Sequence, residues 1–157
     1  LNYTMYRLST TTSQKHTVWP AVSGSRYTQW CCGECWRTSR RALREGPLAA
    51  PKVLALLHDS FVSSWALVTE LKSHAGNTIL PGVSMIASLS LDAYTFPVQI
   101  LIQEASGYVV AAINANQVLD AELNDTMIQQ GFHDPAEFVY YKFLEEGLKK
   151  YRDIFID

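Results

Sequence analysis

The stretch FPVQILIQEASGYVVAAIN, residues 96–114, carries the clearest fold signal in this chain of 157 residues. Its two apolar runs, FPVQILI and YVVAAIN, are rich in residues that favour strands, and they flank the turn residues EASG. This arrangement predicts an antiparallel hairpin. Pro97 has no backbone N–H to donate, so at the start of an inner strand its nitrogen has to face a loop or a site.

A long helix is predicted after the hairpin. Asp134 can cap its N-terminus, and Pro135 takes the first helical position, where a missing N–H costs little. An apolar stripe then recurs every three or four residues, at Phe138, Tyr141, Leu144, Leu148 and Tyr151. Two strands followed by one amphipathic helix therefore form the C-terminal part of the predicted fold.

The N-terminal part is expected to alternate strands and helices. Residues 1–15 read as a linker or a leading strand, because they lack a firm hydrophobic period. KVLALL (52–57) is a continuous apolar run, so it is expected to be a central parallel strand covered on both faces. The other expected elements are a strand at 16–22, a helix at 35–45 that ends at Gly46-Pro47, a helix from Asp59 or Ser60 to about Lys72, and a strand at 83–91.

This order of elements predicts one α/β domain over residues 16–157. Its sheet is expected to be mixed, with parallel strands joined by right-handed crossovers and the antiparallel hairpin on the other side. The order is that of a thioredoxin-like three-layer sandwich with flanking helices, a fold in which a cis-proline opens the strand beside the reactive sulfurs. Pro97 is expected to be that proline. Because the chain begins with Leu1 rather than Met, it is expected to be a fragment of a longer protein.

Composition excludes several classes of protein. Hydrophobic residues make up 48% of the chain and charged residues 18%, which is typical of a globular domain rather than a disordered one. With a net charge of −2, the chain is not expected to bind nucleic acid. No apolar run reaches the roughly 20 residues that cross a bilayer, so membrane attachment is expected only through segments outside this chain.

The three cysteines lie together in WCCGECW, residues 30–36. Three thiols cannot all pair with one another, so a purely structural disulfide framework explains them poorly. Cys32 and Cys35 form a C-x-x-C pair, and if Cys35 begins a helix both sulfurs face the same side. The helix dipole and the unsatisfied N–H groups lower the pKa of such a thiol from about 8.5, to as little as ~3.5 in extreme cases. This pattern predicts a thiol–disulfide oxidoreductase.

Two other interpretations of the cysteines remain. C-x-x-C is half of a tetrahedral zinc site, but the second half is missing, since the histidines are scattered singly at His16, His58, His74 and His133. The cysteines could instead be small buried apolar residues, although this leaves the adjacent pair Cys31-Cys32 unexplained. No metal or cofactor is therefore expected in this chain. Arg37, close to the cysteines, and Arg40 or Arg41 further along would either raise the local potential or belong to a solvated helix face. Glu34 would act in the opposite direction, as a nearby negative charge.

One feature disagrees with the thioredoxin comparison. In that fold the reactive pair begins the helix after the central strand. With 52–57 as the central strand, this place falls at residues 58–64, which contain no cysteine. The ends of parallel strands nevertheless share one edge of a sheet, so the cysteines, Ser63 and Pro97 are expected to lie close together. The vacant place is the best argument for a rival function, a non-catalytic thioredoxin-like module that binds partner proteins.

Four stretches resemble the C-terminal region of the selenoprotein N family. They are WPAV before the cysteine motif, RALRE followed by PKVLALLHDSFVSSWALVTELK, AYTFPVQILI with VVAAINAN, and EFVYYKFLEEGLKK. The resemblance covers most of residues 16–150. The family carries cysteine, selenocysteine and glycine at its redox centre, and Cys31-Cys32-Gly33 is similar to that order, with cysteine in place of selenocysteine. Cys35 and the residues after it depart from the family pattern.

The resemblance implies a membrane glycoprotein of the endoplasmic reticulum, linked to calcium handling, that acts as an oxidoreductase on protein thiols or disulfides. The calcium pump of the reticulum is one partner that it implies. The two sequons Asn2-Tyr3-Thr4 and Asn124-Asp125-Thr126 would be usable as glycosylation sites in that compartment.

The working cysteine pair stays open between Cys31-Cys32, by resemblance, and Cys32-Cys35, by spacing. Adjacent cysteines close only a strained eight-membered ring, which favours the second pair on physical grounds. Cys32 belongs to both pairs and is expected to be the attacking thiolate, while Cys35 or Cys31 resolves the mixed disulfide.

Three further residues complete the predicted site. Pro97 is expected to shape the groove for the partner. Ser63 would orient a sulfur or simply begin a helix, and Trp30 would cover the site, dock a partner or belong to the core.

Overall fold

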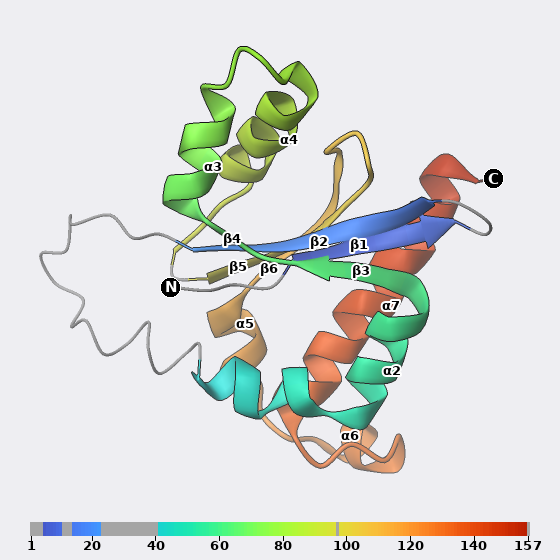
Figure 1. Cartoon of the computed structure of the whole chain (residues 1–157). Coiled ribbons are helices and arrows are strands. Elements are labelled where there is room, and N and C mark those ends of the chain that lie inside the picture. Colours follow the sequence, from blue (N-terminus) through green and yellow to red (C-terminus); the bar gives the residue numbers. More distant parts are fainter. Residues whose placement is uncertain (1–4, 11–13, 23–40, 97, 157) are drawn as a thin grey trace, which may run out of the picture.

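The computed structural model describes the backbone of residues 5–10 and 14–22, and the backbone and side chains of residues 41–96 and 98–156. In this part of the chain, a mixed sheet separates two groups of helices (Figure 1). Along the main path of the sheet the strand order is β3-β1-β2-β5-β6, and β4 pairs with β2. The prediction of a mixed α/β fold is confirmed.

The strands are β1 (Met5–Thr10), β2 (Gln14–Val22), β3 (Phe61–Ser64), β4 (Ala66–Leu67), β5 (Val98–Gln103) and β6 (Val109–Asn114). Most neighbouring strands are antiparallel. The parallel neighbours are β2 with β4 and, at a single residue pair, β1 with β5. Residues 1–15 thus include a leading strand, and the strand predicted at 16–22 is present as part of β2.

The helices are η1 (Pro47–Ala49), α2 (Pro51–Ser60), α3 (Val68–Ala75), α4 (Pro81–Asp92), α5 (Ala115–Leu119), α6 (Asp125–Gln129) and α7 (Pro135–Phe155). Residues 41–45 are also helical. The last bond of this turn runs from the Gly46 N–H to the Ala42 carbonyl over 2.9 Å. The predicted helix end at Gly46-Pro47 is therefore correct, and a short 3₁₀ turn follows it.

Strand β5 is covered on both faces, and all six of its residues are buried. On one face, Val98, Ile100 and Ile102 join the main core together with residues of α2 and α7. On the other face, the Gln103 amide nitrogen donates to the Ser90 hydroxyl of α4 over 3.1 Å. Because this buried amide has a partner, the strand can carry a polar residue inside. The sheet is consequently the middle of three layers (Figure 1).

The predicted hairpin is confirmed as β5 and β6, with Leu101 opposite Ala112. Gly107 lies in the turn between the two strands and has a φ of 95°. A side chain there would also meet α4, because a Cβ would lie 2.9 Å from Cγ1 of Ile86. Glycine is therefore required at this position for its conformation and for its small size.

Helix α7 begins as predicted, since the Ala136 N–H donates to the Asp134 carboxylate over 2.9 Å. The predicted stripe is correct at Leu144 and Tyr151, whereas the full buried stripe comprises Ala136, Tyr140, Phe143, Leu144, Gly147 and Tyr151. The physical reason is Gly147, where an added Cβ would overlap Cδ1 of Ile102 in β5. The helix turns its glycine toward the sheet to allow this close approach, which a count of apolar residues does not reveal.

The strand predicted at 52–57 is wrong, because these residues lie within α2. Pro51 occupies the first position of the helix, where proline is well tolerated. Val53 and Leu57, four residues apart, are buried, whereas Leu54 between them is 48% exposed. The apolar run is thus one face of a helix with an additional exposed leucine, rather than a strand covered on both faces.

The helix predicted from Asp59 or Ser60 to Lys72 is wrong over its first half. Phe61–Ser64 form β3 and pair with β1, with Phe61 opposite Leu8. The helix α3 starts only at Val68. Phe61 is 4% exposed, so its burial beside β1 outweighs the helical spacing of the segment.

The strand predicted at 83–91 is also wrong, because Pro81–Asp92 form α4. The alternation of VSMIASLSL is compatible with a strand, but Ala87 and Ser90 are the buried residues, and they are three positions apart as in a helix. Helices α3 and α4 pack against each other through a second, smaller apolar cluster that includes Leu71 and Ala87.

Candidate thiol site

Most residues of the predicted site lie outside the described part of the chain. Residues 23–40 hold Trp30, Cys31, Cys32 and Cys35, and Pro97 is likewise outside it. The structure does describe the residues where the chain enters and leaves these segments.

The last described residue before the cysteine segment and the first one after Pro97 lie side by side at one end of the sheet. Val22, the last residue of β2, is the Cα partner of Val98, the first residue of β5. Val22 is also the partner of Leu67 at the end of β4. We call this place the Val22 end of the sheet, defined by Val22, Leu67 and Val98. The chain enters the cysteine segment directly from it, and Pro97 is adjacent to it in sequence.

The central strand of the sheet is β2 and not the predicted strand at 52–57. In the observed order, β2 is the middle strand, with β3 and β1 on one side and β5 and β6 on the other. After β2 the chain passes through the cysteine segment, the helical turn at 41–45, η1, α2 and β3 before it reaches β4, which lies parallel to β2. The place after the central strand is therefore the one that contains the cysteines. The vacant place predicted at residues 58–64 was an error, because these residues are the end of α2 and β3.

Ser63 is the one predicted site residue whose position and side chain are described. It lies in β3 opposite Tyr6 and is exposed, so it does not begin a helix. Leu67 at the Val22 end follows four residues later, which corresponds to about 13 Å at ~3.3 Å per residue of extended chain. This separation gives no support to Ser63 as a group that orients a sulfur.

The segment before Pro97 is held by the side chain of Asn114, which sequence reasoning missed. The Asn114 amide nitrogen donates to the carbonyl oxygens of Thr95 and Phe96 over 3.1 and 3.0 Å. The Thr95 hydroxyl donates to the buried Gln99 side chain. The signal in the sequence was Asn114 itself, because an asparagine between a strand and a helix is a typical N-cap.

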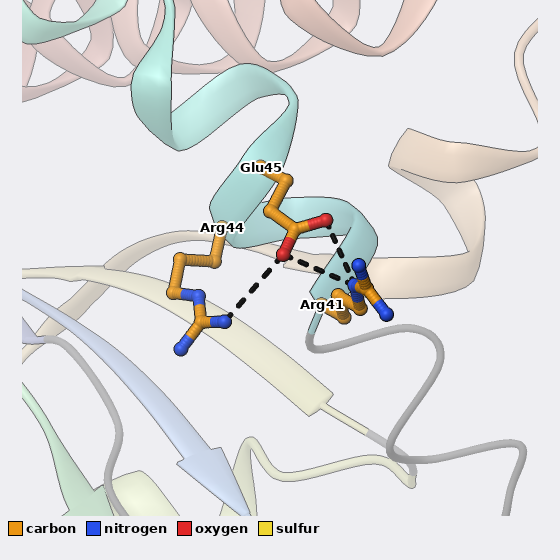
Figure 2. A network of polar contacts seen from close by, with 3 residues as sticks. All are labelled: Arg41, Arg44 and Glu45. Carbon is orange, nitrogen blue, oxygen red and sulfur yellow. Dashed lines mark hydrogen bonds and ion pairs between the residues drawn. The ribbon is translucent and has the colours of Figure 1, made fainter.

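Charges near the cysteine segment are largely paired. Figure 2 shows Arg41, whose Nε donates to Oε2 of Glu45 over 2.9 Å, and Arg44, whose Nη2 lies 3.6 Å from Oε1 of Glu45. The hydrogen bond from Arg41 is the main cause that lowers the pKa of Glu45, with further contributions from the charges of Arg41 and Arg44. All three side chains are exposed. Arg41 therefore belongs to a solvated face, and its charge is already compensated.

Metal binding and membrane spanning can be judged only for the part of the chain that the structure describes. Among those residues, no three side chains of His, Cys, Asp or Glu come together in a way that could hold a metal ion. The cysteine segment is not covered by this statement, so the zinc interpretation still concerns that segment. None of the described helices has the length and apolar character needed to span a membrane.

Comparison with known proteins identifies relatives over most of the chain. Selenoprotein N of Danio rerio is 42% identical over 134 residues, and the match covers 81% of this chain and 23% of that protein. Selenoprotein N of Mus musculus and of Homo sapiens are 38% and 37% identical, again over 81% of this chain. The chain thus spans less than a quarter of the length of each of these three relatives. No family model matches the chain, and no solved structure does.

Proposed function

This chain is homologous to a region of selenoprotein N over 81% of its length, and on this premise we propose that it is a thiol–disulfide oxidoreductase. Cys32 is the attacking thiolate, Cys35 or Cys31 is the resolving thiol, and Pro97 lines the groove for the partner. The substrates are proteins that carry a disulfide or a pair of thiols. The resemblance predicted from the sequence motifs is confirmed by these relatives.

The observation that carries the proposal is the pairing of Val22 with Val98. It brings the strand that leads into the three cysteines next to the strand that follows Pro97. A peptide bound at the Val22 end would therefore lie beside the described residues from which both segments continue.

The strand arrangement supports a thioredoxin-like fold for the domain. Thioredoxin-like domains place the reactive pair after the central strand and a proline before the antiparallel neighbour of that strand. Here β2 precedes the cysteines, β5 follows Pro97, and β2 and β5 are antiparallel neighbours. The hairpin β5–β6 and the helix α7 complete the C-terminal part of such a fold.

The reaction that we propose transfers two electrons from the chain's thiols to the partner disulfide and needs no cofactor. The Cys32 thiolate attacks one sulfur of a partner disulfide and displaces the other sulfur as a thiolate, which takes up a proton. The resolving thiol, after losing its proton, attacks Cys32 in the mixed disulfide and releases the second partner sulfur. The chain ends with one disulfide and the partner with two thiols. Run in reverse, the same steps oxidise a partner dithiol.

Trapping of the mixed disulfide tests this proposal and identifies the pair. Replacing the resolving cysteine should let the mixed disulfide with a peptide disulfide accumulate, so it should be visible by mass spectrometry under non-reducing conditions. If the pair is Cys32-Cys35, Cys35→Ser traps the adduct and Cys31→Ser does not. If the pair is Cys31-Cys32, Cys31→Ser traps the adduct and Cys35→Ser does not. Adduct formation that persists at the wild-type level in Cys32→Ser would refute the assignment of the nucleophile.

The cellular setting that we propose follows from the family. The full-length protein would be a membrane glycoprotein of the endoplasmic reticulum, linked to calcium handling, with the reticulum calcium pump among its partners. Asn124 of the second sequon is exposed at the start of α6. Expression of the full-length protein with and without the sequon, followed by glycosidase treatment, checks the compartment through the sugar.

The rival function, a non-catalytic binding module, loses its best argument. It depended on a vacant place after the central strand, and the observed central strand β2 leads into the cysteines. A binding module would bind partners equally well when Cys32 is replaced by serine, whereas the proposed oxidoreductase would no longer form the mixed disulfide.

A further inference from the structure

We propose that Asn114 is a positioning residue that holds the chain before Pro97 in the geometry that receives a partner peptide. This inference rests on the proposed oxidoreductase function. Asn114 touches neither the cysteines nor a substrate in this account, and acts through the backbone of Thr95 and Phe96.

Asn114 sits where three elements meet. It is the last residue of β6 and the N-cap of α5. It also lies opposite Gln99 in the hairpin, one residue further along β5 than Val98 at the Val22 end. From this position its side chain spans the gap between the start of α5 and the segment that approaches β5.

The side-chain oxygen of Asn114 caps the N-terminus of α5. This Oδ1 accepts from the Asn116 N–H over 3.0 Å, and the backbone N–H of Asn114 donates to Oε1 of Gln117 over 2.9 Å. This is an ordinary helix cap, and aspartate, serine or threonine would provide the same acceptor.

The side-chain nitrogen of Asn114 has no role in the cap. The amide nitrogen donates to the carbonyl oxygens of Thr95 and Phe96 and to the Thr95 hydroxyl, over 3.0 to 3.1 Å. Since the Asn116 N–H requires an oxygen and the two carbonyls require a donor, the orientation of the amide is determined by its partners. Of the residues common at N-caps, only asparagine supplies both an acceptor and a donor pair.

The held segment faces solvent next to the predicted groove. The Phe96 side chain is 49% exposed, although phenylalanine is commonly buried, and Pro97 follows directly. A backbone fixed before binding loses less conformational entropy when a partner docks on it. Losing the amide donor should therefore weaken the binding of a peptide and leave the chemistry of the thiols unchanged.

The chain offers a matched control in Asn124. Asn124 caps α6 by accepting from the Met127 N–H over 3.0 Å. The same substitutions at Asn114 and Asn124 therefore keep a cap acceptor in both places. At Asn114 alone they also remove a donor that bonds Thr95 and Phe96.

The test measures exchange of unglycosylated protein with a peptide disulfide and with a small aromatic disulfide. Asn114→Ser and Asn114→Asp should raise KM for the peptide about 5- to 30-fold, the effect expected for one lost hydrogen-bonding group. The rate with the small disulfide and its pH profile should stay at the wild-type level, and Asn124→Ser and Asn124→Asp should behave as wild type. If Asn114→Asp does not fold, Asn114→Ser, which adds no charge, carries the test.

The outcomes separate this inference from the proposed function. A peptide KM within about twofold of wild type in a folded Asn114 variant, below the size of one lost hydrogen bond, overturns the positioning role. An equal loss with the small disulfide overturns it as well, because the defect then lies at the thiols or in the fold. A wild-type chain that exchanges neither disulfide refutes the oxidoreductase function itself, and with it the inference.

Discussion

The close approach of α7 to the sheet makes Gly147→Ala a sharp test of the fold. Gly147 is buried in α7, and Ile102 in β5 is fully buried. A Cβ added at Gly147 would overlap Cδ1 of Ile102 and would lie 3.4 Å from its Cγ1. Overpacking of this kind costs about 1 to 3 kcal/mol, and alanine returns up to about 1 kcal/mol of helix propensity. We expect Gly147→Ala to lower the free energy of unfolding by about 1 to 2 kcal/mol.

A second substitution isolates the contact. Ile102→Val removes Cδ1 and should itself cost about 0.5 to 1.5 kcal/mol. In that background the remaining atoms of residue 102 lie 3.4 and 3.7 Å from the new Cβ, which is ordinary packing distance. Gly147→Ala should then be neutral or stabilising, so the two changes should couple by about 1 to 3 kcal/mol.

Urea denaturation of the four proteins measures this cycle. Gly82→Ala is the control, because nothing lies within 4 Å of its Cβ position in α4, and it should stabilise by about 0.5 kcal/mol. If the effects of Gly147→Ala and Ile102→Val simply add, α7 does not approach β5 as described, and the explanation of its buried stripe fails.

Three other predictions concern caps and titrating groups. Asp134→Ala should lower the free energy of unfolding by about 1 kcal/mol in urea titrations, because it removes the cap of α7, and an unchanged stability would contradict that role. Burial, followed by the charge of Glu104, raises the pKa of Tyr151, so its contribution to stability is complete below pH ~10 and declines as the pH rises toward the raised value. Tyr151→Phe should flatten the alkaline stability profile between these two values, and an unaltered profile would argue against the raised pKa. Arg41→Ala should raise the pKa of Glu45 toward its ordinary range in an NMR titration, since the Arg41 hydrogen bond is the main cause of the lowered value. In the wild-type chain the contribution of Glu45 to stability is complete above its ordinary pKa and is lost as the pH falls through the lowered value. An unchanged pKa in the variant would contradict the ion pair.

The parts of the fold that the sequence predicted are those where local signals agree with tertiary contacts. In the hairpin, strand-favouring residues flank Gly107, and the glycine has the positive φ that such a turn needs. Asp134 and Pro135 likewise mark a helix start that requires no distant partner. These elements are where the prediction placed them.

The wrong predictions concern segments whose secondary structure depends on contacts with residues far away in the sequence. KVLALL has the composition of an inner strand, and only the burial of Val53 and Leu57 on one face reveals a helix. Phe61–Ser64 continue a helical pattern in sequence but pair with β1, more than fifty residues away along the chain. A single sequence contains no record of such a pairing.

These errors also affected the predicted site. Choosing residues 52–57 as the central strand displaced the expected thioredoxin position to residues 58–64 and drew Ser63 into the site. With β2 as the central strand, the cysteine motif follows that strand in the sequence, so the error concerned the choice of strand, and the role of the cysteines stays a prediction. Asn114 was missed because its donor bonds connect residues eighteen and nineteen positions apart.

The reactivity of Cys32 tests the central claim most directly. In a chain that keeps Cys32 but has serine at positions 31 and 35, the rate of alkylation is measured across pH. The account predicts half-maximal reactivity below about pH 7, as expected for a thiolate stabilised at the start of a helix. A midpoint near the ordinary thiol value of about 8.5 would contradict it.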